Sequence, residues 1–175
     1  SSRGYNSFWL KQDVPGCLAA LSNDCTSVVA AVVMIGTHDA VQAGSTQHVP
    51  VADYVENLRD IVSTLKLQLP SSEVVLLTAP CIHEGRLRQE PVLPGKPTRD
   101  QGRTNAKLGQ YATAMRAVAA ESDCVCIDLH RLTSKCELIE GLNWADLLTD
   151  GLSLNQAANA AVTPLPPPAP PPPPP

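Results

Sequence analysis

Three short apolar runs constrain the fold of this chain more than any other feature. They cover residues 28–35, 74–78 and 124–129, and none of them alternates apolar with polar residues. A half-buried strand alternates, whereas a strand inside a parallel sheet that is covered on both faces has a continuous apolar sequence. We therefore predict three strands that are buried on both faces.

Long segments with helical periodicity separate these runs. Apolar residues recur every three or four positions between Pro50 and Pro70, and the same spacing returns from Leu108 to Ala119. Strands that alternate with helices indicate right-handed crossovers and a mainly parallel sheet, so the predicted fold class is α/β. Ligands of such sheets bind beyond the carboxyl ends of the strands, where residues 36–40 and 78–84 fall.

Length and charge limit the remaining possibilities. The 175 residues support a single domain, which we place at 1–162, and a proline-rich tail at 163–175. The formal net charge of -4 does not favour nucleic acid or an anionic membrane as a partner. The longest apolar run is far shorter than the roughly 20 residues that span a bilayer, so we expect no membrane span.

The six cysteines are scattered through the chain, and no Cys-x-x-Cys pair occurs. A domain of this size folds without disulfides, so free thiols in a reducing compartment are the favoured interpretation. We expect a soluble, cytoplasmic protein. No metal site and no cofactor are predicted, because Cys124 and Cys126 alternate on an apolar run as small buried side chains do.

Four short motifs follow one another along the chain, and a fifth feature, Gly4, lies before them in Arg3-Gly4-Tyr5-Asn6. In order, the motifs are Gly36-Thr37-His38-Asp39, then Gln47-His48-Val49-Pro50 leading into Tyr54, Asn57 and Leu58, then Arg103-Thr104-Asn105, and finally Asp150-Gly151-Leu152-Ser153-Leu154. The set resembles the SGNH (GDSL-type) hydrolase family, particularly its isoamyl acetate-hydrolysing esterase branch. The resemblance extends from Gly4 to about Ala160 and implies a flavodoxin-like three-layer sandwich that hydrolyses carboxylic esters.

The resemblance also implies which residues form the site. Gly4, Gly36 and Asp39 match family positions around the oxyanion hole, and His38 stands where the family has the oxyanion-binding Asn. Asp150 matches the family acid, whereas Ser153 occupies the position of the base His. The family nucleophile belongs to a Gly-Asp-Ser block, which this sequence does not contain. We therefore expect an N-terminally truncated domain that lacks the first strands of its sheet.

These replacements predict impaired chemistry. A serine hydroxyl is a weak nucleophile unless an imidazole accepts its proton, and Ser153 is no substitute for that base. The predicted function is an ester hydrolase domain with little or no activity, which would act on a small acyl ester if it is active. The alternative is a non-catalytic scaffold or interaction module. Asp150 could instead cap a final helix that begins near Ser153 or Asn155.

A site rebuilt from other residues is a second possibility. His83 follows the second apolar run and could approach Ser45 or Cys81 to form a new nucleophile and base pair. The alternative interpretation is that His48, His83 and His130 are ordinary polar residues at strand ends and in loops.

Two further segments suggest partners. Without a preceding strand, 28–35 becomes a long apolar edge through which the chain could self-associate. The segment 164–175 is almost entirely proline and is expected to form polyproline II helix. It is either a low-complexity end or a ligand for polyproline-binding domains of the SH3, WW or profilin type.

Overall fold

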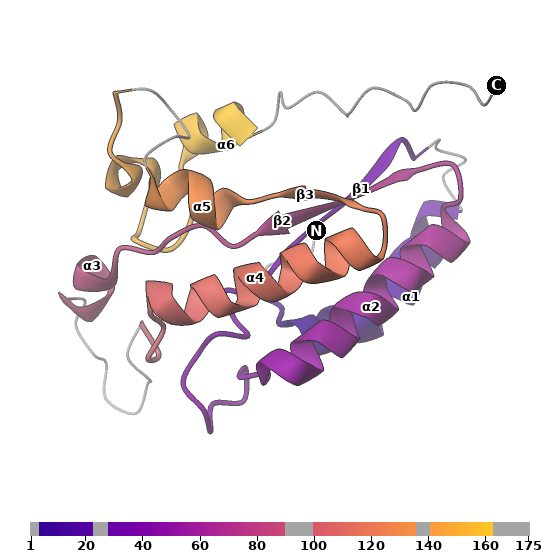
Figure 1. Ribbon diagram of the computed structural model, residues 1–175, viewed down its shortest axis with the longest axis horizontal. Helices are drawn as coiled ribbons and strands as arrows, with labels where there is room; N and C mark the ends of the chain where they lie inside the picture. Colours follow the sequence, from indigo (N-terminus) through magenta and orange to yellow (C-terminus); the bar gives the residue numbers. More distant parts are fainter. Residues whose placement is uncertain (1–3, 23–27, 90–99, 136–140, 163–175) are drawn as a thin grey trace.

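The computed structural model describes residues 4–22, 28–89, 100–135 and 141–162. Three parallel strands form one sheet in the order β1-β2-β3 (Figure 1). Their bounds are β1 Ala30–Ile35, β2 Glu73–Thr78 and β3 Val125–Ile127. All three predicted strands are therefore present, and the predicted α/β class with a parallel sheet is confirmed.

Helices connect the strands, and the two long predicted helices are also confirmed. Helix α2 begins directly after Pro50, and the Thr104 hydroxyl caps α4 by accepting a hydrogen bond from the Lys107 N–H at 3.2 Å. The helices are α1 Ser7–Ser22, α2 Val51–Gln68, α3 Glu84–Gln89, α4 Asn105–Glu121, α5 Leu129–Ser134 and α6 Gln156–Val162, with a 3-10 turn η1 at Trp144–Leu147. None of the helices in the described ranges is long and apolar enough to cross a bilayer.

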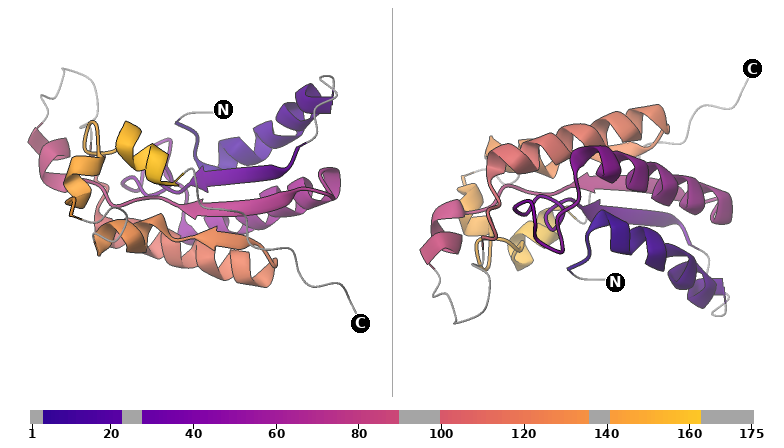
Figure 2. Two further views of the ribbon diagram at one scale, coloured as in Figure 1. Left: turned by 90° about the horizontal axis from the view of Figure 1, so that it is seen from above. Right: turned by 90° about the horizontal axis from the view of Figure 1, so that it is seen from below.

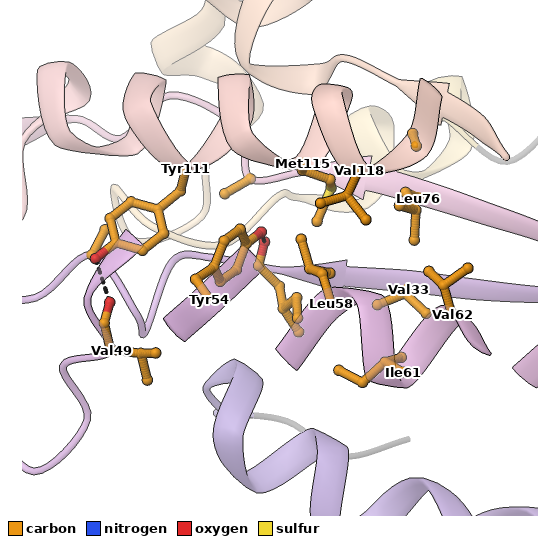
Figure 3. Packing of buried hydrophobic residues seen from close by; sticks show 14 of the residues in the cluster. Val33, Val49, Tyr54, Leu58, Ile61, Val62, Leu76, Tyr111, Met115 and Val118 are labelled. Carbon is orange, nitrogen blue, oxygen red and sulfur yellow. Dashed lines mark hydrogen bonds between the residues drawn. The ribbon is translucent and has the colours of Figure 1, made fainter. Parts of the chain in front are cut away.

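One face of the sheet carries the hydrophobic core. Helices α1, α2 and α4 lie on this face (Figure 2) and contribute buried side chains to one cluster with β1 and β2. Figure 3 shows how the side chains of α2 and α4 pack against the strands. Because side chains alternate along a strand, only every second residue of β1 takes part. The residues at the centre of this packing are Val33, Leu58, Ile61, Val62, Leu76, Met115 and Val118.

The opposite face of β1 is open, which corrects the prediction of burial on both faces. Val32 is 62% exposed and Met34 51% exposed, although both belong to the continuous apolar run. Helices α1, α2 and α4 lie on the other face of the sheet (Figure 2), and the burial pattern of β1 alternates accordingly.

β1 lies at the edge of the three-stranded sheet, as expected, because its described pairing is with β2 alone. The tail at 163–175 lies outside the described residues, and so do Cys25 and Cys136. Cys124 and Cys126 carry free thiols, and burial raises the pKa of both.

Candidate functional site

The loop that follows β1 begins at a position that favours glycine. Gly36 has a φ of +117°, and a Cβ there would lie 3.2 Å from the Tyr54 hydroxyl oxygen. That hydroxyl donates a hydrogen bond to the Ile35 carbonyl at 3.3 Å, so α2 fixes the end of β1. A larger residue at Gly36 would combine backbone strain with displacement of this contact.

Tyr111 of α4 holds the rest of this loop. Its hydroxyl contacts the carbonyl oxygens of Asp39 at 3.2 Å and Val49 at 2.5 Å (Figure 3 shows the second contact). The ring packs edge-on against Tyr54 with centroids 5.0 Å apart. Two tyrosines from two helices therefore position the loop that carries Gly36, His38 and Asp39.

Asp39 joins this loop to the start of α1. Its carboxylate oxygen Oδ1 accepts a hydrogen bond from the Ser7 N–H at 2.8 Å, while Oδ2 has no hydrogen-bond partner among the described residues. The side chain is fully buried, and this burial raises its pKa, although hydrogen bonds from Ser7 oppose the shift. Asn6 caps the same helix by accepting from the Trp9 N–H at 2.9 Å.

Gly4 and His38 lie side by side at the end of β1. A Cβ built on Gly4, whose φ is +80°, would lie 4.0 Å from Nε2 of the His38 ring. Gln47 donates a hydrogen bond from Nε2 to the Gly4 carbonyl at 3.4 Å. The structure thus brings together two of the residues that were matched to the oxyanion hole, although Gly4 and His38 are 34 positions apart in the sequence.

The Arg103-Thr104-Asn105 motif connects the loops that follow β1 and β2. Arg103 is only 2% exposed and donates from Nε to the Thr37 carbonyl at 2.7 Å. The Asn105 side chain hydrogen-bonds both backbone groups of Ile82: Oδ1 accepts from the Ile82 N–H at 2.8 Å, and Nδ2 donates to the Ile82 carbonyl at 3.0 Å. Thr104 between them begins α4, so one short motif ties a helix start to two strand ends.

Asp150 and Ser153 also lie together, within one turn of the chain. Oδ1 of Asp150 accepts from the N–H groups of Leu152 at 3.0 Å and Ser153 at 2.6 Å. The Ser153 hydroxyl donates to Oδ2 of Asp150 at 3.3 Å. The alternative that Asp150 caps the final helix is wrong: α6 begins at Gln156, and Asn155 caps it by accepting from the Ala158 N–H at 3.0 Å.

The described contacts of His83 are with the start of α3, with η1 and with the Asp150 loop. Its Nδ1 accepts from the Arg86 N–H at 3.1 Å, and its ring lies 5.7 Å from the ring of Trp144. The backbone N–H of His83 donates to the Gly151 carbonyl at 2.8 Å, which attaches the Asp150 loop to the segment after β2. His83 therefore has a structural role at this edge of the sheet.

His48 and His130 likewise bind the backbone. Nδ1 of His48 lies 3.1 Å from the Asp39 carbonyl oxygen, and Nε2 of His130 lies 3.1 Å from the Asn105 carbonyl oxygen. His48 also lines an open pocket of about 490 Å³ between the first turns of α1 and α2. The lining of this pocket includes neither Gly4 nor His38, so the pocket does not coincide with the oxyanion positions.

The whole chain can be compared with known sequences. The profile of the GDSL-like lipase/acylhydrolase family matches residues 2–174. The chain belongs to this family. It is 36% identical over 164 residues to a GDSL esterase/lipase of Arabidopsis thaliana, with 91% of this chain and 66% of that protein aligned. It is 31% identical over 162 residues to the isoamyl acetate-hydrolyzing esterase 1 homolog of Bos taurus, with 91% and 62% aligned.

Solved structures agree at the level of the fold. A catalytic mutant of the acetylxylan esterase Axe2 from Geobacillus stearothermophilus matches with a TM-score of 0.62 at 20% identity, over 91% of this chain and 64% of that one. The lipase/acylhydrolase of Enterococcus faecalis matches with a TM-score of 0.55 at 21% identity, over 81% and 60%. The flavodoxin-like SGNH fold implied by the resemblance is thereby confirmed. The chain spans just under two thirds of the length of these relatives.

The contacts of Arg103 and Gln47 are a part of the site that the sequence does not reveal. Arg103 and Gln47 belong to recognised motifs, yet only the structure places their side chains against His38 and Gly4. In the sequence, the available signal is an arginine directly before a threonine that can cap a helix. No sequence pattern indicates which carbonyl or ring it would face.

Proposed function

We propose that this chain is a carboxylic ester hydrolase domain of the SGNH type whose catalysis is impaired. Gly4 beside His38 at the end of β1 supports the family site, because backbone and ring N–H groups there suit a developing oxyanion. The main support for impaired catalysis is the contact between Asp150 and Ser153. A hydroxyl, and not an imidazole, donates to this carboxylate at 3.3 Å.

The chemistry explains why this replacement matters. In a hydrolytic triad the imidazole removes the proton of the nucleophile and later returns it to the leaving group, while the carboxylate orients the ring. The Ser153 hydroxyl cannot accept that proton near neutral pH. What remains is the electrostatic part of the site, without the proton-transfer part.

A small acyl ester is the substrate that we propose for any residual activity. Two of the relatives are named for isoamyl acetate and acetylxylan, and both names refer to acetyl esters. The negative charge of the chain also agrees with a small neutral substrate better than with a polyanion.

Hydrolysis of p-nitrophenyl acetate tests the impaired site. We expect the chain to release p-nitrophenol no faster than a Ser153→Ala variant, because Ser153 contributes no base that could be lost. Saturable turnover in the unchanged chain, together with covalent labelling by an organophosphonate, would contradict the proposal. Ser153→His is the companion variant: it restores a base beside Asp150, and a gain of turnover would show that a nucleophile is available.

A non-catalytic interaction module is the second candidate, and the replacement of the family residues by His38 and Ser153 favours it. Its partner would be a polyproline-binding domain that takes up residues 164–175. Calorimetric titration of SH3, WW and profilin domains with the chain, with and without its tail, tests this idea. Equal heats for the two forms would rule out the tail as the contact.

Two finer expectations also remain proposals. Self-association through 28–35 is supported by the edge position of β1 and by the exposed side chains of Val32 and Met34. A reducing compartment such as the cytoplasm is supported by the free thiols of Cys124 and Cys126. Detection of a tagged full-length protein after cell fractionation would test the location.

A further inference from the structure

The guanidinium of Arg103 is fixed on two sides. Nε donates to the Thr37 carbonyl at 2.7 Å, and Nη1 lies 3.4 Å from the Asp100 carbonyl. Arg103 is almost fully buried. Its backbone N–H donates to the Asp100 carbonyl, so the residue directly follows a tight turn. Arg103 therefore has little freedom to rotate, and the direction of its remaining N–H groups is set by the backbone around it.

One of these groups faces His38. Nη2 of Arg103 lies 3.3 Å from Nδ1 of the His38 ring. A guanidinium carries five N–H donors and no acceptor, so the ring nitrogen on this side must accept. Burial lowers the pKa of Arg103 to about 10, which still leaves the guanidinium protonated at neutral pH. In a neutral imidazole whose Nδ1 accepts, the proton sits on Nε2.

We propose that Arg103 is a positioning residue that holds His38 in the Nε2–H tautomer and directs this N–H to the oxyanion position beside Gly4. The inference rests on the proposed function, since it assigns a donor to the oxyanion position of that same site. It differs from the family pattern, where an Asn amide needs no tautomer to present an N–H.

The neighbours of His38 Nε2 are consistent with a proton on this nitrogen. Nε2 lies 4.0 Å from the Cβ position of Gly4, and the Gln47 side chain hydrogen-bonds the ring. Gln47 also donates to the Gly4 carbonyl, so it holds the two oxyanion positions together. Gln47 therefore contacts both residues, and an N–H on Nε2 of His38 lies on the side of the ring that is next to Gly4.

A doubly protonated His38 would also present an N–H here, but its surroundings oppose that state. Burial, and next the positive charge of Arg103, lower the pKa of His38, while the hydrogen bond with Gln47 acts in the opposite direction. Protonation of Nδ1 would also turn the contact with Arg103 into two donors that face each other. The neutral tautomer is thus the form that fits both neighbours.

Nitrogen NMR of the protein labelled with ¹⁵N-histidine and ¹⁵N-arginine tests the proposal. The resonances of His38 are assigned by their loss in His38→Asn. We expect the proton on Nε2, a deprotonated Nδ1, and a scalar coupling across the hydrogen bond between Nδ1 and Nη2 of Arg103. His48 is an internal control with the opposite tautomer expected: its Nδ1 faces a carbonyl oxygen, which cannot donate, so Nδ1 must carry the proton.

Removal of the guanidinium gives the second measurement. In Arg103→Met we expect the titration midpoint of His38 to move to higher pH and the Nδ1–H tautomer to become populated, while exposed Arg59→Met changes neither. A proton on Nδ1 in the unchanged protein, or the absence of the coupling to Arg103, would overturn the proposal even if Arg103→Met did not fold. The readout needs no turnover, so it fails or succeeds independently of the esterase assay.

Discussion

At the scale of single residues, the least expected feature is the buried carboxyl group of Asp39. It anchors the first N–H of α1 through Oδ1, yet Oδ2 is without a hydrogen bond among the described residues. Burial raises its pKa above the ordinary value of 3.8. An ionised group in such a position destabilises the fold, and a neutral group of the same shape would not.

This property predicts a pH dependence of stability. Between 3.8 and the raised pKa, the folded state binds more protons than the unfolded state, so the free energy of unfolding falls as pH rises through this window. In Asp39→Asn this contribution is absent, and we expect the variant to gain stability relative to the unchanged chain as pH rises. Urea denaturation at a series of pH values measures the difference.

The control for Asp39→Asn is Asp53→Asn, which removes the same charge from an exposed position in the first turn of α2. A stability difference between Asp39→Asn and the unchanged chain that stays constant across the window would show that Asp39 does not titrate as proposed.

At the scale of the elements, strand β1 and helix α1 depart most from expectation. Helix α1 contains Pro15 and Gly16, which disfavour a helix interior, so its local sequence does not predict a helix. It forms because Asn6 and Asp39 satisfy its first N–H groups and because Val14 and Leu18 are buried in the core. Tertiary contacts here outweigh local propensity.

Strand β1 provides a matched test, because two neighbouring valines lie on opposite faces. Val33 is 6% exposed within the core, whereas Val32 is 62% exposed. We expect Val33→Ala to cost about 2 kcal/mol of the free energy of unfolding, through lost burial and a cavity. Val32→Ala should stay within about 0.5 kcal/mol. Chemical denaturation of both variants checks this, and equal losses would mean that the open face is covered in solution.

At the scale of the whole molecule, the open edge and face of β1 raise the question of association. Val32 and Met34 are exposed beside backbone groups that do not pair with β2. Such an edge is a template for another strand, and this one carries no charged residue. Self-association through 28–35 is therefore the oligomeric behaviour that we propose.

Size-exclusion chromatography with light scattering tests the association. We expect the unchanged chain to form dimers or larger species as its concentration rises, and Val32→Lys to shift it to the monomer, since a buried lysine at the contact is costly. Leu67→Lys is the control, because Leu67 is equally apolar and 80% exposed but lies on α2. A monomer whose β1 amides are well protected from hydrogen exchange would rule out pairing through this edge.

The sequence by itself determined the α/β class, the three strands, the two long helices and the family. These features depend on local periodicity and on motifs whose residues are close together, such as Gly36 to Asp39 and Asp150 to Ser153. Tertiary structure decided the rest: which face of β1 is covered, that α1 forms despite Pro15, and that Arg103 and Gln47 meet at His38 and Gly4. The physical reason is that hydrophobic periodicity reports how residues repeat along one element, whereas exposure and hydrogen-bond partners depend on which distant segments pack against it.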